Sequence, residues 1–185
     1  MSTTPALLTV EDFHQFGERP GVRVELHHGE VVEIDIPGMG HWRIQERVRQ
    51  ILVESLGGSG MAGMAFAFRP LPEYELWGAD VAWVSWERFE GIDEDDNLAG
   101  APDIVVEVLS PSNTASEMLD RKVLCLDNVC VEFWLIDPKE RIVEITRAGI
   151  GLAHREEITF RSGSSVAVDS RSYEVDDILR GARNR

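Results

Sequence analysis

The sequence of 185 residues is short of positive charge, and it has no long apolar run. Its 18 basic residues face 33 acidic ones, and the net charge of −15 excludes a broad basic face that binds nucleic acid through many phosphates. Any polyanionic partner must therefore bind to a local patch of basic residues. No apolar run of about 18 residues exists, which excludes a membrane partner, and the first nine residues lack a signal-peptide pattern. We expect a cytoplasmic protein.

Cysteine and lysine are also scarce. Cys125 and Cys130 are the only cysteines, and two cysteines within one apolar stretch make no disulfide framework, so both are expected to be buried thiols. Lys122 and Lys139 are the only lysines, because arginine supplies all the other basic residues. This bias weakly favours a specific task for Lys122.

Several familiar motifs are missing or misplaced. The glycines of 58–63 fit the spacing of a dinucleotide-binding loop, but they follow a predicted helix and precede a strand, which is the reverse of the required context. The acidic segment from Asp93 has Leu98 where a calcium loop needs glycine. The sequence has no paired histidines or cysteines at zinc spacing and no nucleophile elbow.

Length and composition predict one domain over 1–185. A capping pattern begins a helix at the start of the chain, and turn residues separate the first two strands into a hairpin. We expect an α/β fold: an α+β mixed sheet with flanking helices and an N-terminal hairpin. The predicted helices cover 10–16, 41–56, about 114–127 (beginning at Ser112 or Thr114) and 175–179, and the predicted strands cover 22–26, 31–36, 61–68, 79–84, 103–109, 131–136, 142–146, 154–160 and 165–168.

Two carboxylates interrupt strands that otherwise read as buried. Asp80 lies at the start of the apolar segment 78–84, and Glu107 lies inside the segment 102–109. A buried carboxylate costs several kcal/mol unless a cation, a metal ion or a proton compensates it. Lys122 lies on the following helix, from which it is expected to reach toward this pair, and Glu25 on the first strand of the hairpin is a fourth candidate.

These residue types suit one kind of chemistry. Two carboxylates, a peptide carbonyl and waters form the oxygen shell that Mg²⁺ or Mn²⁺ prefers, and such sites hydrolyse phosphodiester bonds. A structural explanation also exists for each residue: Asp80 as the cap of a turn, Glu107 as the partner of an arginine such as Arg121, and Lys122 and Glu25 as exposed residues. The residues alone leave both explanations open.

The order of several short segments carries a family resemblance. The most specific is Pro-Asp-Ile-Val-Val-Glu-Val-Leu-Ser-Pro-Ser at 102–112. With the segments 23–31, 78–82, 120–122 and 132–138, and with His41 at the start of a helix, the chain resembles the Uma family. This is a large bacterial group of restriction-endonuclease-like proteins with the PD-(D/E)XK nuclease fold, and the resemblance extends from about residue 8 to residue 179.

The resemblance implies an active site at Asp80, Glu107 and Lys122, with Glu25 contributed by the hairpin. It implies a Mg²⁺ or Mn²⁺ ion bound by Asp80, Glu107 and the carbonyl of Val108, with Lys122 orienting the water.

One departure concerns the lysine. In the wider superfamily a lysine stands two residues after the acid, where this sequence has Leu109, so Lys122 would take that role from the helix. The chain also has Ala115 and Ser116 where many family members have arginine, which weakens the case for tight DNA binding more than the case for the fold.

The resemblance favours a metal-dependent endonuclease that hydrolyses phosphodiester bonds in DNA, acting as a homodimer that brings two sites to opposite strands. The acidic charge favours an alternative, a non-catalytic binding or assembly module that retains the nuclease fold. A third hypothesis is an enzyme acting on a small phosphorylated or acidic metabolite.

Overall fold

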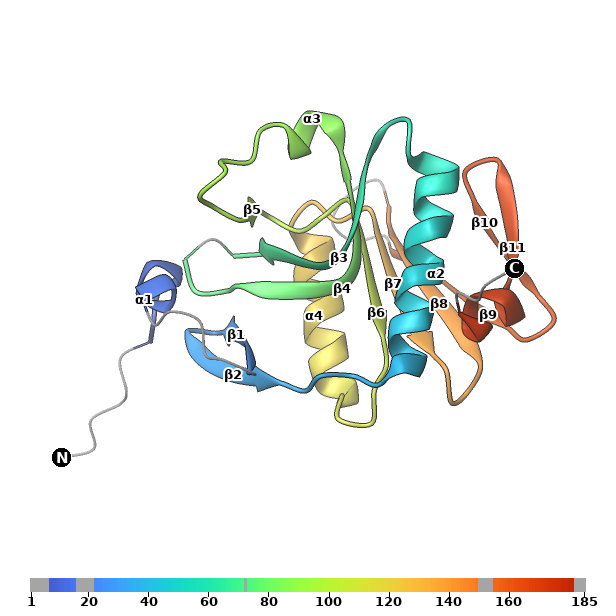
Figure 1. Cartoon of the computed structure of the whole chain (residues 1–185), viewed down its shortest axis with the longest axis horizontal. Coiled ribbons are helices and arrows are strands. Elements are labelled where there is room, and N and C mark those ends of the chain that lie inside the picture. The colour runs from blue at the N-terminus through green and yellow to red at the C-terminus, as the bar shows by residue number, and fades with distance from the viewer. Residues whose placement is uncertain (1–6, 16–21, 72, 150–154, 182–185) are drawn as a thin grey trace.

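The computed structural model describes residues 7–15, 22–71, 73–149 and 155–181, and Figure 1 shows the arrangement of the elements. Their bounds are α1 Val10–Gln15, β1 Arg23–His27, β2 Glu30–Ile34, α2 Met39–Leu56, β3 Gly60–Arg69, β4 Trp77–Ser85, α3 Trp86–Phe89, β5 Leu98–Ala99, β6 Ile104–Val108, α4 Ala115–Asp127, β7 Glu132–Asp137, β8 Ile142–Ala148, β9 Arg155–Arg161, β10 Ser165–Val168, β11 Arg171–Glu174 and α5 Val175–Arg180.

A seven-stranded mixed sheet with the order β5-β3-β4-β6-β7-β8-β9 forms the centre. Most neighbouring strands are antiparallel, while β3 and β5 are parallel, as are β6 and β7, which α4 connects as a crossover helix. All five residues of β6 are buried, as expected of a central strand covered on both faces. The sheet therefore presents the end of β6 between two layers of helices.

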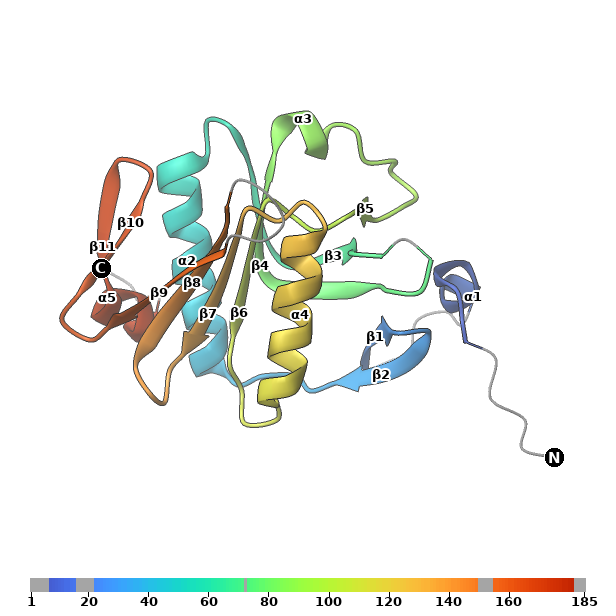
Figure 2. The ribbon, with the colours of Figure 1, turned by 180° about the vertical axis from the view of Figure 1, so that it is seen from behind.

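Helices cover both faces of the sheet, as Figures 1 and 2 show from opposite sides. Each face has its own apolar cluster. Helix α2 packs its apolar stripe, which includes Ile44 and Val48, against Val106 of β6, and the β10–β11 hairpin and α5 extend this layer. On the other face, Cys125 of α4 packs with Val105. Because side chains alternate along a strand, Glu107 lies on the same face as Val105, which is the α4 face.

The hairpin of β1 and β2 is a separate two-stranded sheet at one end of the central sheet. His28 and Gly29 make its turn, both with φ in the left-handed region, at 50° and 74°. A bridge between Leu26 and Leu76 attaches β1 to the segment before β4, and these two leucines form a small apolar cluster with Val10. The hairpin thus extends beside the end of the sheet where β4 begins.

The expected mixed α/β fold is confirmed, including the N-terminal hairpin and the capping patterns. Thr9 and Asp12 cap α1, and a full capping box between Thr114 and Glu117 decides for Thr114 over Ser112 as the start of α4. The short elements α3, β5 and β11 were not predicted, and residues 16 and 154, the expected ends of two elements, lie outside the described ranges. Within those ranges, no helix has the length and apolarity needed to cross a membrane.

Candidate active site

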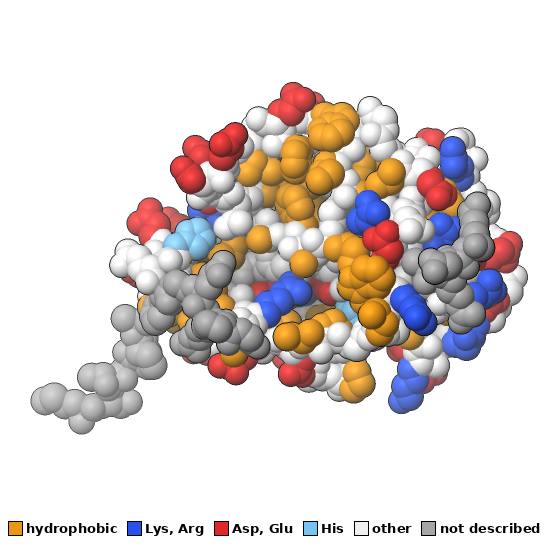
Figure 3. Space-filling model, viewed as in Figure 1, with side chains coloured by type: hydrophobic (Ala, Val, Ile, Leu, Met, Phe, Trp, Pro, Cys, Tyr) orange, Lys and Arg blue, Asp and Glu red, His pale blue; other side chains and the backbone are white. Residues whose placement is uncertain are grey.

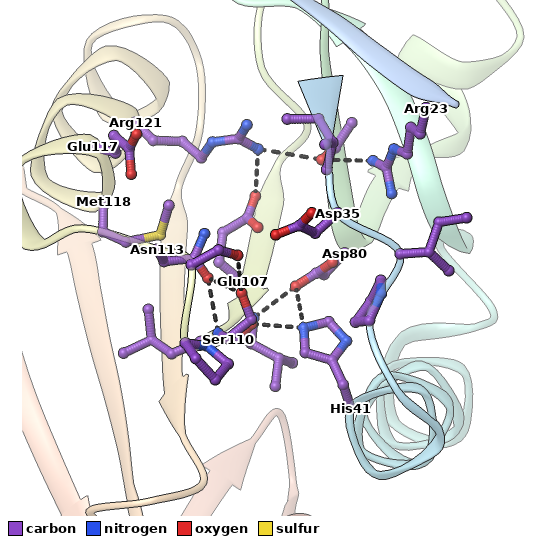
Figure 4. Close-up of a pocket in the computed structure, with 18 of the residues that line it drawn as sticks. Arg23, Asp35, His41, Asp80, Glu107, Ser110, Asn113, Glu117, Met118 and Arg121 are labelled. Carbon is purple, nitrogen blue, oxygen red and sulfur yellow. Dashed lines mark hydrogen bonds and ion pairs between the residues drawn. The ribbon is translucent and has the colours of Figure 1, made fainter. Parts of the chain in front are cut away.

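A cleft of about 1300 Å³ lies between the hairpin, the start of α2, the ends of β4 and β6, and α4. The face that holds it is hollowed near its middle in Figure 3, and Figure 4 shows its side chains. Asp80, Glu107, Val108 and Glu25, four residues predicted from the sequence, all line this cleft. The structure therefore brings together residues from three separate strands.

Asp80 is held in place from two sides. Its Oδ1 accepts a hydrogen bond from Gln45 Nε2 of α2 at 2.7 Å, and its Oδ2 accepts one from the Val108 backbone N–H at 2.8 Å. The pairing of β3 with β4 skips one position, at which Asp80 faces Ala65, whose φ is 50°. This irregularity in the ladder lies beside the carboxylate, where a departure from regular pairing is common in functional sites.

Glu107 is buried and has a single cationic partner. Arg121 of α4 donates from Nη1 to Glu107 Oε1 at 2.9 Å, and no other described residue donates a hydrogen bond to this carboxylate. Arg121 is itself buried, and its guanidinium lies over the Trp77 ring at 5.0 Å from the centroid. Glu107 therefore pairs with Arg121, which is the structural explanation that the sequence left open for it.

Glu25 shares the same arginine but has more partners. Arg121 Nη2 donates to Glu25 Oε2 at 2.6 Å, and the Gly78 backbone N–H donates to Oε1 at 3.1 Å. His27 Nε2 lies 2.8 Å from Oε2. A Cβ at position 78 would lie 2.1 Å from Arg23 Nη2, so a larger residue where the hairpin meets β4 would displace the end of the Arg23 side chain.

The two carboxylates on Arg121 have opposite pKa shifts. Burial raises the pKa of Glu107 to about 8, because the charge of Arg121 offsets only part of the desolvation and the nearby Asp80 and Glu25 oppose it further. Burial also acts to raise the pKa of Glu25, but the charge of Arg121 and the contact with His27 lower it to about 2. The positive charge around Glu107 is therefore too small to keep it ionised, whereas the positive charge around Glu25 is sufficient.

His41 marks the point where two oxygens of the cleft converge. Its Nε2 lies 2.7 Å from the Val108 carbonyl oxygen and 3.2 Å from Asp80 Oδ2. Burial acts to lower the pKa of His41, but the hydrogen bond and the charge of Asp80 raise it. A positively polarised N–H is thus held between a carboxylate oxygen and a carbonyl oxygen.

Lys122 is the predicted site residue that the structure does not bring to this group. Its Nζ donates to Glu144 Oε1 at 2.8 Å and to Glu157 Oε2 at 2.7 Å, on β8 and β9, and Lys122 does not line the cleft. Consecutive residues of a helix point about 100° apart, so only one of Arg121 and Lys122 can face Glu107. The cation beside the carboxylates is Arg121.

Three contacts of the site were not anticipated from the sequence, namely those of Arg121 with Glu25, of Gln45 with Asp80 and of His41 with Val108. One signal for Arg121 was present: Met118, Arg121 and Cys125 share the buried stripe of α4, and Lys122 falls outside it. Gln45 lies on the buried face of α2 in the same way.

The cleft offers oxygen donors of the chemical type that divalent metal ions prefer. Within the described ranges, no group of three or more His, Cys, Asp or Glu side chains forms a ready metal site, so a metal ion would need the backbone carbonyl as well. Asp80 Oδ2 and the Val108 carbonyl already converge on one positive hydrogen, and Glu107 has too little positive charge around it. Hard oxygen donors of this kind suit Mg²⁺ and Mn²⁺.

The mixed sheet with its crossover helix and flanking helices is a restriction-endonuclease-like α/β fold, as two comparisons indicate. The model of the Uma2 family, described as "Putative restriction endonuclease", matches residues 10–172. The chain belongs to this family, and the resemblance drawn from its sequence is confirmed.

A solved structure has the same fold. It is described as a "putative nuclease belonging to DUF820" from Anabaena variabilis, is 21% identical in sequence, and superposes with a TM-score of 0.74 over 93% of this chain and 97% of its own. No curated protein matches the chain in sequence. Family and fold together make this protein nuclease-like.

Proposed function

We propose that the protein is a metal-dependent endonuclease that hydrolyses phosphodiester bonds in DNA. One observation carries the proposal: the buried carboxylate of Glu107 has only Arg121 to compensate its charge and lines the same cleft as Asp80 and the Val108 carbonyl. A carboxylate in this state destabilises the fold and gains from a further cation. Membership of the Uma2 family supports the same chemistry.

In this proposal Asp80, Glu107 and the Val108 carbonyl hold Mg²⁺ or Mn²⁺. When bound, the metal ion supplies Lewis-acid stabilisation and an activated water for attack on phosphorus. The chain's own residues fix the donors: Arg121 holds Glu107 through Oε1, while Gln45 holds Asp80. Glu25 holds the second arm of Arg121 and so limits the rotation of the guanidinium.

DNA as the partner and assembly as a homodimer belong to the same proposal. A dimer would bring two clefts into one assembly, and its existence stays a prediction from the resemblance. The alternative of a non-catalytic module is favoured by one observation, because Glu107 pairs with the cationic side chain of Arg121. The two candidates differ in whether a metal ion binds.

Titration of Mn²⁺ and Mg²⁺ by calorimetry separates them. We expect the wild type to bind the metal ion, and Asp80→Asn to bind it at least about tenfold more weakly, because the variant loses a charged ligand. Asp95→Asn, a matched change in the exposed acidic loop, is expected to bind as the wild type does. Absence of binding to the wild type, with no cleavage of DNA, would favour the non-catalytic module.

Lys122→Ala tests the role that the sequence assigned to the lysine. We expect metal-dependent cleavage to stay within about twofold of the wild type, because Nζ bonds to Glu144 and Glu157 away from the cleft. The expected loss of stability is about 1 kcal/mol, since the two ion pairs of Lys122 lie only partly buried at the edge of the sheet. Loss of cleavage with normal metal binding would instead support Lys122 as a catalytic residue.

A further inference from the structure

An exposed apolar group stands at the mouth of the cleft, where the chain enters α2. Ile36 is 76% exposed, Met39 65% and Trp42 48%. Met39 and Trp42 are three residues apart on the first turns of the helix and so lie on one side of it. Ile36 lines the cleft, as do His41 and Arg43 on either side of Trp42. Met39 and Trp42 themselves do not line the cleft. Trp42 directly follows His41, which contacts Asp80, so its exposed aromatic ring lies at the rim of the cleft.

Two arginines lie beside this apolar group. Arg43 and Arg180 both line the cleft and are both exposed. Gly181, directly after Arg180, packs so closely on Arg43 that a Cβ there would lie 2.7 Å from Arg43 Cβ, which places the ends of α5 and α2 side by side. In Figure 3, basic side chains gather toward the α5 end of this face and acidic ones toward α3 and β5.

These arginines are free to bind an anion. Arg43 has no acidic partner within the described part of the chain, and Arg180 has only a long pair of 4.0 Å with Asp177. The start of α2 adds to this charge, since Gly38 provides no side-chain cap and the first turn carries no acidic residue. A chain with a net charge of −15 thus keeps a small positive region at one edge of the cleft.

The geometry of the cleft disfavours a rigid duplex. Glu107 is 7% exposed and the Asp80 side chain 13%, so the carboxylates lie at the bottom of the cleft. A duplex is stiff over many base pairs and presents a charged backbone. The side chains of Ile36, Met39 and Trp42 form neither ion pairs nor strong hydrogen bonds with its phosphates. An unpaired strand bends into a cleft and exposes its bases, which stack on aromatic side chains.

We infer that the cleft takes single-stranded nucleic acid. The strand enters across the start of α2, with a base stacked on Trp42 and its phosphates on Arg43 and Arg180. This inference rests on the proposed nuclease function and specifies its substrate class.

Binding measured without divalent metal tests the inference, because cleavage then does not intervene. The probe is a fluorescein-labelled DNA strand of about 20 nucleotides, which exceeds the site size of most single-strand binders, alone or in a matched duplex. We expect the single strand to bind at least about tenfold more tightly than the duplex. Trp42→Ala should weaken binding of the strand about tenfold, while Trp42→Phe keeps most of the affinity.

Two controls separate stacking and charge from general damage. Trp86→Ala removes an exposed tryptophan on α3, and Arg171→Gln removes an exposed arginine on β11; both should bind as the wild type does. Arg43→Gln should reduce the slope of log affinity against log salt by about 0.7, the value for one phosphate contact of a single strand. Circular dichroism checks that each variant is folded.

Three results would overturn the inference: equal or tighter binding of the duplex, equal effects of Trp42→Ala and Trp86→Ala, or a dimer in sedimentation that Trp42→Ala dissociates. The last result would show that a second copy of the chain covers Trp42. Cleavage of duplex DNA without preference for the single strand would leave the proposed function standing. Binding of the single strand without any cleavage would contradict the proposed function but not the inference about the strand.

Discussion

Glu107→Gln is expected to abolish metal-dependent cleavage while making the folded protein more stable. Glutamine keeps the size of the side chain and accepts the hydrogen bond from Arg121 Nη1, but it removes the charge that would bind the metal ion. It also removes a buried carboxylate that has a single cationic partner. Loss of activity combined with a gain in stability is typical of a group retained for function.

The gain should depend on pH. Burial raises the pKa of Glu107 from an ordinary 4.5 to about 8 in the folded protein. Between these values the folded state holds a proton that the unfolded chain has released, so the free energy of unfolding of the wild type falls as the pH rises through this window. The variant has no such group and should be the more stable above it, by about 2 kcal/mol or roughly 4–8 °C in Tm.

Thermal unfolding of both proteins across this pH range provides the measurement. The two curves are expected to approach each other near about pH 5 and to separate as the pH rises. Glu156→Gln, the same change at an exposed position on β9, should show no such separation. A variant that is less stable than the wild type at every pH would show that the Glu107 carboxylate is fully compensated.

Arg121→Met is expected to cost about 3–5 kcal/mol of stability, because it leaves Glu25 and Glu107 buried without their shared cation. In Tm this corresponds to roughly 6–20 °C for a chain of this size. The loss should shrink as the pH falls, since protonation removes the uncompensated charges. Arg121 also joins α4 to the hairpin through Glu25, so the variant should loosen β1, detectable as faster amide hydrogen exchange.

A second variant distinguishes lost charge pairing from lost packing. Arg121→Met combined with Glu107→Gln removes one of the stranded carboxylates and should recover part of the stability. Arg147→Met removes an arginine from the 2.7 Å pair with Glu132 on the sheet surface and should cost less than about 1 kcal/mol. If the double variant is as unstable as Arg121→Met alone, packing over Trp77 accounts for the loss.

The carboxylates of the site could be predicted because each breaks a local rule. Asp80 and Glu107 are acids within strands whose neighbours are all apolar, and burial of those strands follows from their composition. The face on which Glu107 lies follows from strand alternation, because side chains two residues apart always lie on the same face of a strand. The fold class followed from the same patterns together with the family resemblance.

Which basic residue pairs with these carboxylates could not be predicted as reliably as the carboxylates themselves. Arg121 and Lys122 are adjacent, and selecting between them needs the rotational phase of α4, which an error of one residue reverses. The rarity of lysine favoured Lys122, whereas the buried stripe of the helix favoured Arg121. The contacts of His41 and Gln45 depend on how α2 crosses the sheet, which no local pattern of the sequence contains.

The order in which the chain is made bears on when the cleft can exist. Arg121 lies 96 residues after Glu25, so the hairpin and β4 leave the ribosome well before the arginine that joins them. Domains generally fold as units during synthesis, with their N-terminal parts emerging first. A nascent or truncated chain that ends before α4 carries the carboxylates without the cation that assembles them. The cleft is therefore expected to be complete only after α4 has emerged.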